Sequence, residues 1–271
     1  MISIKKIGFM QGRLVPPLRN RIQAYPLNNW QKEFYLAFKI KIKLMEWTID
    51  SHKFFENALI NESQHLILSD LKNKFKIKIN SVTADFFMEK YNLKNFKLRN
   101  NKYFNFFLKM CFLNKIKIIV IPMVDKCSIN KSFNYVNRIV NKFNQLQPLL
   151  KKYKLKIAFE VDLKPKDCLY FISHFDKKYY GINYDIGNSI GNGFNYVDEI
   201  NTYGKRIINV HIKNMNKNKT CDLFKGGGNI KKIIKFLKKK KYNKNYILQT
   251  ARVTKGHSKK IKQYLDVIKG L

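Results

Sequence analysis

Eight short runs rich in β-branched and aromatic residues alternate along the chain with longer stretches of helical periodicity. This alternation is typical of repeated βα units, in which each strand joins a parallel sheet and each helix covers it. Several runs are apolar at every position, as expected for strands that are buried on both faces. We expect strands at Ser3–Phe9, Lys43–Trp47, Lys78–Val82, Ile116–Ile121, Lys156–Glu160, Tyr180–Tyr184, Ile207–His211 and Asn245–Leu248.

The length of the chain fits one closed barrel. Its 271 residues, 45% of them hydrophobic, are close to the roughly 250 residues of a typical (β/α)8 barrel. Helical stripes of apolar residues run over 133–150 and 230–237, while Pro16, Pro17 and Pro26 predict a loop over 13–29. No linker or repeat suggests a second domain. We therefore predict an α/β fold, a (β/α)8 TIM barrel, as a single domain over residues 1–271.

The net charge of +36 invites interpretation as a nucleic-acid or membrane-binding protein. However, the lysines are spread along the whole chain and come with many Asn, Ile, Phe and Tyr residues, which favours compositional drift and solvated helix faces. Attraction of an anionic substrate or of nucleic acid stays open as the alternative. We expect no specific nucleic-acid partner and no membrane partner.

The four cysteines form no C-x-x-C pair and indicate free thiols in a reducing compartment. Residues 1–8 are too short and too charged for a secretory signal, and no apolar run approaches the roughly 20 residues that span a bilayer. We expect a soluble, cytoplasmic protein. The sequence leaves open whether it forms a homo-oligomer.

Four apolar runs each end in a residue that can bind a metal: Glu160, Asp185, His211 and Gln249. Side chains at the carboxyl ends of barrel strands project into one mouth, so these residues are expected to meet. Taken singly, Glu160 can serve in an ion pair, Asp185 as a cap and His211 in the core. Together, two carboxylates and one imidazole suit one divalent ion, whether Mn, Mg, Co, Fe or Zn.

A series of short motifs falls in a consistent order along almost the whole chain: Gly8-Phe-Met-Gln-Gly-Arg13, Asn28-Asn-Trp30, Met45-Glu-Trp47, Ile79-Asn-Ser-Val82, Ile119-Val-Ile-Pro122, Phe159-Glu-Val-Asp162, Asp185-Ile-Gly-Asn188, Val210-His-Ile-Lys213 and Leu248-Gln-Thr-Ala-Arg252. These motifs resemble those of xylose isomerase-like TIM-barrel proteins, in particular the sugar phosphate isomerase/epimerase branch. The resemblance implies that Glu160, Asp185 and His211 are metal ligands and that Glu160 also handles a substrate proton.

Gln249 differs from the residue that the family has at this position. In the best-known epimerases of the family, the last strand supplies a second glutamate that binds metal and acts as the opposite acid or base. An amide oxygen can still coordinate a cation but cannot take up a proton at ordinary pH. We therefore expect Gln249 to be a fourth ligand in a more neutral site, which should polarise a carbonyl more strongly and bind its metal less tightly.

The implied activity is that of a metal-dependent isomerase or epimerase that acts on a sugar or sugar phosphate through an enediolate. Glu160 is the expected base. Glu46, at the end of the second strand, is the first candidate for a second catalytic group, followed by Asp85 and His52. Binding a substrate hydroxyl or orienting a metal ligand is the favoured role for Glu46.

Further residues are expected to bind substrate: Gln11, Arg13, Trp47, Asp85, Asn188, Lys213 and Arg252. Lys213 lies on the same face of its strand as His211, and Trp47 offers an apolar face to a sugar ring. The turn at 226–229 provides backbone N–H groups for a phosphate, or merely starts a helix with Asn229 as its cap.

Two other functions compete with this prediction. An endonuclease IV-like enzyme for abasic DNA needs several zinc ions and many histidines, but the chain has five histidines and reads Asn188 where a second histidine would stand. A catalytically degenerate barrel that only binds a ligand is the third possibility, with Gln249 as its first sign. Metal content would separate the three.

Overall fold

Eight parallel strands close into a barrel in the computed structural model, which describes residues 1–18, 23–89, 99–130, 132–217 and 219–271. The order around the barrel is β1-β10-β7-β6-β5-β4-β3-β2, and β2 pairs with β1 to complete it. These strands are β1 (Ile7–Met10), β2 (Leu44–Ile49), β3 (Lys78–Ala84), β4 (Ile118–Met123), β5 (Lys156–Val161), β6 (Tyr180–Asp185), β7 (Ile207–Ile212) and β10 (Asn245–Leu248). The predicted (β/α)8 barrel is confirmed.

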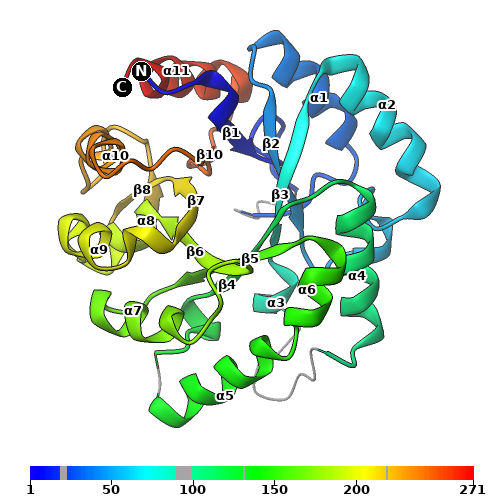
Figure 1. The fold of residues 1–271 in the computed structure, drawn as a ribbon. Helices are drawn as coiled ribbons and strands as arrows, with labels where there is room; N and C mark the ends of the chain where they lie inside the picture. The colour runs from blue at the N-terminus through cyan, green and yellow to red at the C-terminus, as the bar shows by residue number, and fades with distance from the viewer. Residues whose placement is uncertain (19–22, 90–98, 131, 218) are drawn as a thin grey trace.

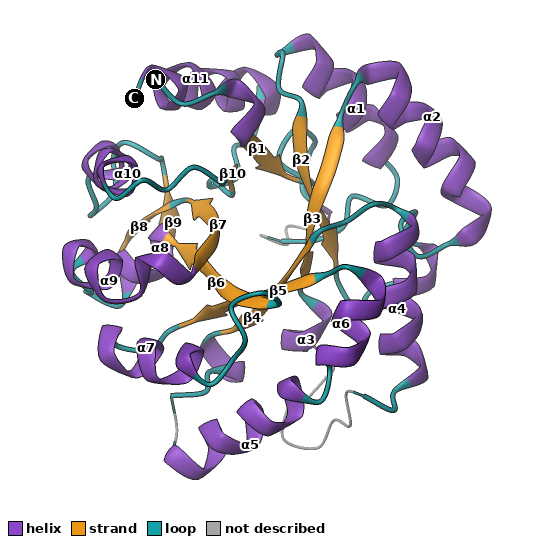
Figure 2. Ribbon diagram, in the orientation of Figure 1, coloured by secondary structure: helices purple, strands orange, loops and turns teal. Residues whose placement is uncertain are grey.

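Helices surround the strands, as the purple and orange ribbons of Figure 2 show. The two chain ends lie side by side next to α11 (Figure 1), where the Ile2 amide donates to the Lys269 carbonyl at 3.2 Å. The helices are α1 (Trp30–Lys39), α2 (His65–Phe75), α3 (Phe86–Glu89), α4 (Lys102–Leu113), α5 (Phe133–Asn144), α6 (Gln147–Tyr153), α7 (Pro165–Ser173), α8 (Ile186–Gly191), α9 (Tyr196–Tyr203), α10 (Ile230–Lys239) and α11 (His257–Gly270).

Three local expectations need correction. Residues Ile4–Lys6 form a 3-10 turn, so the first strand starts at Ile7. The stripe over 133–150 is two helices, α5 and α6, because Pro148 lacks the N–H that a continuous helix requires. A hairpin of β8 (Asn214–Asn216) and β9 (Lys219–Cys221) follows β7 and was not anticipated.

Other local expectations agree with the structure. The described part of 13–29 contains no strand or α-helix, and residues 19–22 lie outside the described ranges. The apolar stripe of α10, formed by Ile230, Ile233, Ile234 and Leu237, is buried. All four cysteines are free.

Apolar side chains fill the lower part of the barrel interior. Met10, Leu44 and Ile247 form one cluster, and Val120, Ala158 and Ile208 form another. Because side chains alternate along a strand, the next inward positions toward the carboxyl ends of β2 and β5 are Glu46 and Glu160, which are both polar. The barrel therefore places its polar interior residues near the mouth where active sites of this fold occur.

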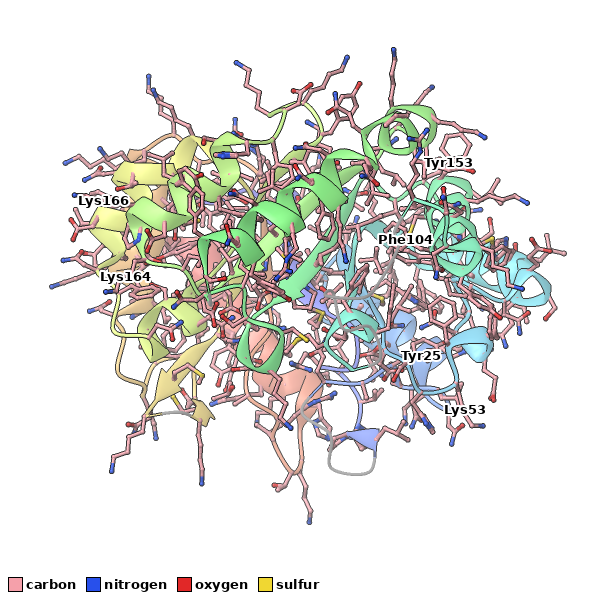
Figure 3. All side chains as sticks on the ribbon, turned by 90° about the horizontal axis from the view of Figure 1, so that it is seen from below. Tyr25, Lys53, Phe104, Tyr153, Lys164 and Lys166 are labelled. Carbon is pink, nitrogen blue, oxygen red and sulfur yellow. The ribbon has the colours of Figure 1, made fainter. Side chains whose placement is uncertain are left out.

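The positive charge lies around the outside of the molecule. Nitrogen-tipped side chains extend from all around the outline in Figure 3, with Lys164 and Lys166 at one edge and Lys53 at another. All three are exposed, whereas the labelled Phe104 is buried. Within the described ranges, no helix combines the length and apolarity required to cross a membrane.

Candidate metal centre

Glu160, Asp185 and His211 come together at the carboxyl ends of β5, β6 and β7. One potential ligand atom from each lies within 4.8 Å of the others, and all three residues are buried. The strands are neighbours in the barrel, and Asp185 is directly in register with His211. Three of the four strand-end residues predicted as ligands therefore share one place.

The imidazole of His211 is held from both sides. Its Nε2 lies 2.5 Å from Glu46 Oε1, while Nδ1 lies 3.2 Å from Glu160 Oε2 and 3.8 Å from Asp185 Oδ2. In the neutral tautomer that donates Nε2–H to Glu46, Nδ1 accepts from Asn183 Nδ2 at 3.0 Å, on the side of the ring where the two carboxylates lie. Histidines that bind metals commonly have such a carboxylate partner on the other ring nitrogen.

Glu46 lies beneath these residues, inside the barrel and without solvent exposure. Ser81 Oγ donates to Oε2 at 2.6 Å, Thr83 Oγ1 to Oε1 at 2.7 Å, and Asn209 Nδ2 to Oε2 at 2.9 Å. Both carboxylate oxygens are thus engaged by fixed side chains and by His211. This geometry favours the role of orienting His211 over direct proton transfer.

Two amides hold the carboxylate of Glu160. Asn188 Nδ2 donates to Oε1 and Asn183 Nδ2 donates to Oε2, both at 2.7 Å. Burial alone would raise the pKa of Glu160, but the hydrogen bond and positive charge of His211 lower it to about 2. Asn183 was missed in the sequence, although it lies two residues before Asp185 and hence on the same strand face.

The protonation of His211 reflects the same cluster. Burial lowers its pKa, but the charge of Glu46 and hydrogen bonds to Glu160 and Glu46 outweigh burial and raise it to about 10. Without a metal, a proton on this imidazole therefore provides the positive charge that the surrounding carboxylates require. A divalent cation would balance the negative charge of the same carboxylates.

Lys213 forms an ion pair with Asp185, with Nζ and Oδ2 2.9 Å apart. Its aliphatic stem lies directly on Gly187, where an added Cβ would stand 2.2 Å from Lys213 Cγ. The other oxygen of Asp185 accepts from the Asn188 N–H at 2.9 Å and so caps α8. Lys213 thus lies beside the cluster through its contact with Asp185, and its contact with a substrate stays a prediction.

Gln249 immediately follows β10, the strand that pairs with β7, which carries His211. Its N–H donates to the Ile212 carbonyl at 3.0 Å, and alternation places its side chain on the inward face shared with Ile247. Its buried Oε1 has no hydrogen-bond partner among the described residues. A buried acceptor without a donor needs an explanation, and a cation would provide one. The donor set therefore fits a divalent metal.

Arg13 and Arg252 connect the first loop to the segment after β10. Arg13 is buried, and its Nε donates to the Thr250 carbonyl at 2.9 Å. Arg252 donates to the Val15 carbonyl at 3.3 Å. Burial and then the charge of Arg252 lower the pKa of Arg13 to about 9, and the negative charge of Asp85 opposes this. These residues therefore gather near one another at the mouth.

Gln11 is also buried beside the mouth, where its Oε1 accepts from the Thr48 N–H at 3.1 Å. Its side-chain oxygen is thus engaged by the β2 backbone. Any contact of Gln11 with a substrate must come from its Nε2, which has no hydrogen-bond partner among the described residues.

The expectation that Trp47 contacts substrate is wrong. Trp47 has no solvent exposure, donates from Nε1 to Asn57 Oδ1 at 2.8 Å and packs edge-on against Trp30 with ring centroids 5.9 Å apart. Because Glu46 points into the barrel, the next residue of the strand must point outward to the helices. Trp47 is therefore part of the core between sheet and helices.

The turn before α10 is occupied by internal hydrogen bonds. Gly227 N–H donates to the Met215 carbonyl at 2.7 Å, and Gly228 N–H donates to Asn214 Oδ1 at 3.2 Å. Asn229 accepts from the Lys232 N–H at 3.1 Å and caps the helix. The structure supports a helix-entry turn rather than a phosphate site.

None of the four histidines other than His211 belongs to a barrel strand. His65 and His257 begin helices, His174 ends α7, and His52 lies in the turn after β2. Each lacks the position that a cluster of several zinc ions would require. The endonuclease-like alternative therefore gains no support from the geometry.

Comparison with known proteins supports the fold assignment. A family model described as a xylose isomerase-like TIM barrel matches residues 113–271. An uncharacterized protein of Methanocaldococcus jannaschii is 28% identical over 153 residues, which are 50% of this chain and 52% of that protein. The match thus spans about half the length of this curated relative.

Three solved structures share the fold over nearly the whole chain. A sugar phosphate isomerase/epimerase from Parabacteroides distasonis has a TM-score of 0.72 and 12% identity, covering 97% of this chain and 95% of its own. The 3-keto-D-glucoside 4-epimerase of E. coli has a TM-score of 0.70 and 12% identity, covering 98% and 99%. The IolI protein, solved with a zinc atom, has a TM-score of 0.69 and 16% identity, covering 97% and 96%.

Proposed function

Because the chain belongs to the xylose isomerase-like TIM-barrel family, we propose that it is a metal-dependent isomerase or epimerase acting on a sugar or sugar phosphate. The observation that carries this proposal is the buried group of Glu160, Asp185 and His211, with ligand atoms within 4.8 Å of one another. Gln249 is the proposed fourth ligand because its buried Oε1 has no partner among the described residues. Sugar epimerases and isomerases among the similar structures agree with this class.

A divalent cation held by these residues would act as a Lewis acid on a carbonyl and its neighbouring hydroxyl. Glu160 is the proposed base that removes the proton from the carbon between them, giving an enediolate. Asn183 and Asn188 fix both of its oxygens, so the carboxylate is positioned before substrate arrives. Glu160 would be more basic beside a neutral His211 than beside a protonated His211, because the positive charge of the imidazolium lowers the pKa of Glu160.

The carbon and the face to which the proton returns decide between isomerisation and epimerisation. Gln249 cannot accept a proton, and the Glu46 carboxylate is enclosed by its four donors beneath His211. Glu160 is therefore the best-placed group for both removal and return. This arrangement favours transfer between adjacent carbons on one face, which is aldose-ketose isomerisation.

Cationic side chains are the proposed contacts for substrate oxygens. Lys213 is held near Asp185 and is placed to stabilise negative charge that develops on an oxygen at the cluster. Arg13, Arg252 and Asp85 lie near one another, and with Gln11 they are proposed to recognise the remote end of the substrate. Asn188 is proposed to position Glu160 in addition to any contact with substrate.

The test combines metal analysis with solvent-deuterium exchange. We expect about one divalent ion per chain and deuterium uptake next to the carbonyl in a panel of ketoses and sugar phosphates. Glu160→Gln should abolish uptake in a folded protein, while the exposed control Glu62→Gln should retain it. Full uptake by Glu160→Gln would refute the base assignment. Several zinc ions with abasic-site cleavage would indicate a nuclease, and no metal a ligand-binding barrel.

A further inference from the structure

A second concave site lies at the end of the barrel opposite the candidate metal centre. This cavity of about 350 Å³ is lined by Lys117, Lys154, Lys156 and Lys244 together with Asn80 and Asn245. These residues lie within two positions of the first residues of β3, β4, β5 and β10, so the cavity is the lower mouth of the barrel. Lys156 lies four positions before Glu160 on β5, which places the two sites about 13 Å apart along the strand.

A short pattern repeated at strand entries brings several lysines to this rim. Lys-Ile-Lys or Lys-Leu-Lys occurs at 41–43, 76–78, 115–117 and 154–156. The first lysine of each has a positive φ, and the middle residue is buried. The third lysine begins or immediately precedes a barrel strand. Lys156 N–H donates to the Lys117 carbonyl at 2.9 Å, so two of these entries lie side by side.

The four lysines of the lower mouth have no opposite charge beside them. None of the described residues that line the cavity is acidic, and none of these ammonium groups forms an ion pair within the described part of the chain. Burial, and then the charge of Lys156, lowers the pKa of Lys244. A concave surface lined by one sign of charge concentrates counter-ions more strongly than scattered lysines do.

The rest of the lining suits a small molecule rather than a polymer. Ile118 and Ile208 form the floor and belong to the apolar cluster that separates the cavity from the polar interior above it. The amides of Asn80 and Asn245 offer neutral donors and acceptors beside the lysines. The volume lies at the lower end of the range for small-molecule sites, about 300–1,000 Å³.

We propose that the lower mouth of the barrel binds a small phosphorylated anion carrying at least two negative charges. Lysine ammonium groups bind phosphate oxygens as point charges, and four of them from three strand entries can neutralise such an anion together. The site is independent of the reaction proposed for the metal centre, because it uses no residue of that cluster.

The test uses inorganic pyrophosphate as the probe, titrated calorimetrically into the full-length protein at physiological salt. We expect saturable binding that Lys156→Gln with Lys244→Gln weakens about tenfold, since exposed charge contacts contribute modestly and additively. The control pair Lys232→Gln with Lys235→Gln removes the same charge from the exposed face of α10 and should leave affinity within twofold. Lys117→Gln alone should weaken binding in the same direction.

Three outcomes would overturn the proposal. The first is a wild-type protein that shows no saturable binding, and the second is equal weakening by the α10 control pair, which would indicate non-specific attraction. The third is binding that survives the double substitution but disappears in Lys213→Gln, which would place the anion at the metal centre. Circular dichroism of every variant checks that the fold is retained.

Discussion

Replacing Glu46 by glutamine tests whether this buried carboxylate orients His211. The substitution keeps the size of the side chain but removes its charge and one acceptor oxygen. Glu46 receives hydrogen bonds from Ser81, Thr83, Asn209 and His211, the last at 2.5 Å. Both hydroxyl groups can rotate to accept from the new amide, whereas the His211 N–H loses its anionic partner. The damage should therefore concentrate on His211.

The magnitude follows from the number and type of bonds lost. One charge-assisted bond to a buried group is replaced by a weaker neutral one, which costs about 2 kcal/mol of folding free energy. For a chain of this size, that loss lowers Tm by about 4–8 °C. Loss of the partner that orients a metal-binding histidine reduces metal affinity about 10–100-fold. Glu46→Ala should lower the free energy of unfolding more, by about 3–5 kcal/mol, because it removes the carboxylate and leaves His211 buried without its charged partner.

The assay is a competition titration of metal against a chelator, accompanied by thermal unfolding. Glu33→Gln is the matched control, since Glu33 is an equally buried carboxylate that accepts from the Gly12 and Leu14 N–H groups. It should lose comparable stability but keep its metal affinity. If Glu46→Gln binds metal as tightly as the wild type, or if both variants lose affinity equally, the orienting role is refuted.

Three further substitutions distinguish residues of the proposed site from residues that only stabilise the fold. Trp47→Ala should destabilise the fold by about 3–5 kcal/mol in denaturant unfolding while the metal content stays unchanged, because Trp47 is a core residue. Gly187→Ala should slow deuterium exchange by displacing Lys213, whereas Gly191→Ala should not, since its added Cβ meets Met215 Cε only at 3.6 Å. Gln249→Glu should tighten metal binding in chelator competition, because it adds a negative charge to the ligand set; unchanged affinity would count against Gln249 as a ligand.

The fold and the meeting of the three proposed ligands could be predicted from the sequence. Apolar runs and helical stripes are set by local periodicity, and seven of the eight predicted strands start within two residues of their observed positions. Parallel strands in one barrel have their carboxyl ends at one rim, so Glu160, Asp185 and His211 had to approach each other. The exception, β1, lies where Ile4–Lys6 turns instead of extending, a local choice that β propensity does not determine.

The side-chain contacts across the barrel interior could not be predicted from the sequence. Glu46 and His211 belong to β2 and β7, which are separated by β1 and β10 in the sheet order. Which inward side chains meet across the interior depends on the stagger of the strands, and two register shifts, at Met45/Glu46 and Ile182/Asn183, alter that stagger. Neither register shift can be inferred from sequence periodicity. The Glu46–His211 contact is therefore evident only from the structure.

Alternation along β2 nevertheless excluded one prediction in advance. Adjacent residues of a strand face opposite sides, so Glu46 and Trp47 cannot both line the barrel mouth. The polar residue is inside because Ser81, Thr83 and Asn209 provide donors there, and the indole is outside because Tyr25, Trp30 and Phe34 surround it. A slip of β2 by one residue would bury the carboxylate among aromatic rings and leave His211 without its partner. The network around Glu46 therefore fixes the register of β2 as well as the orientation of His211.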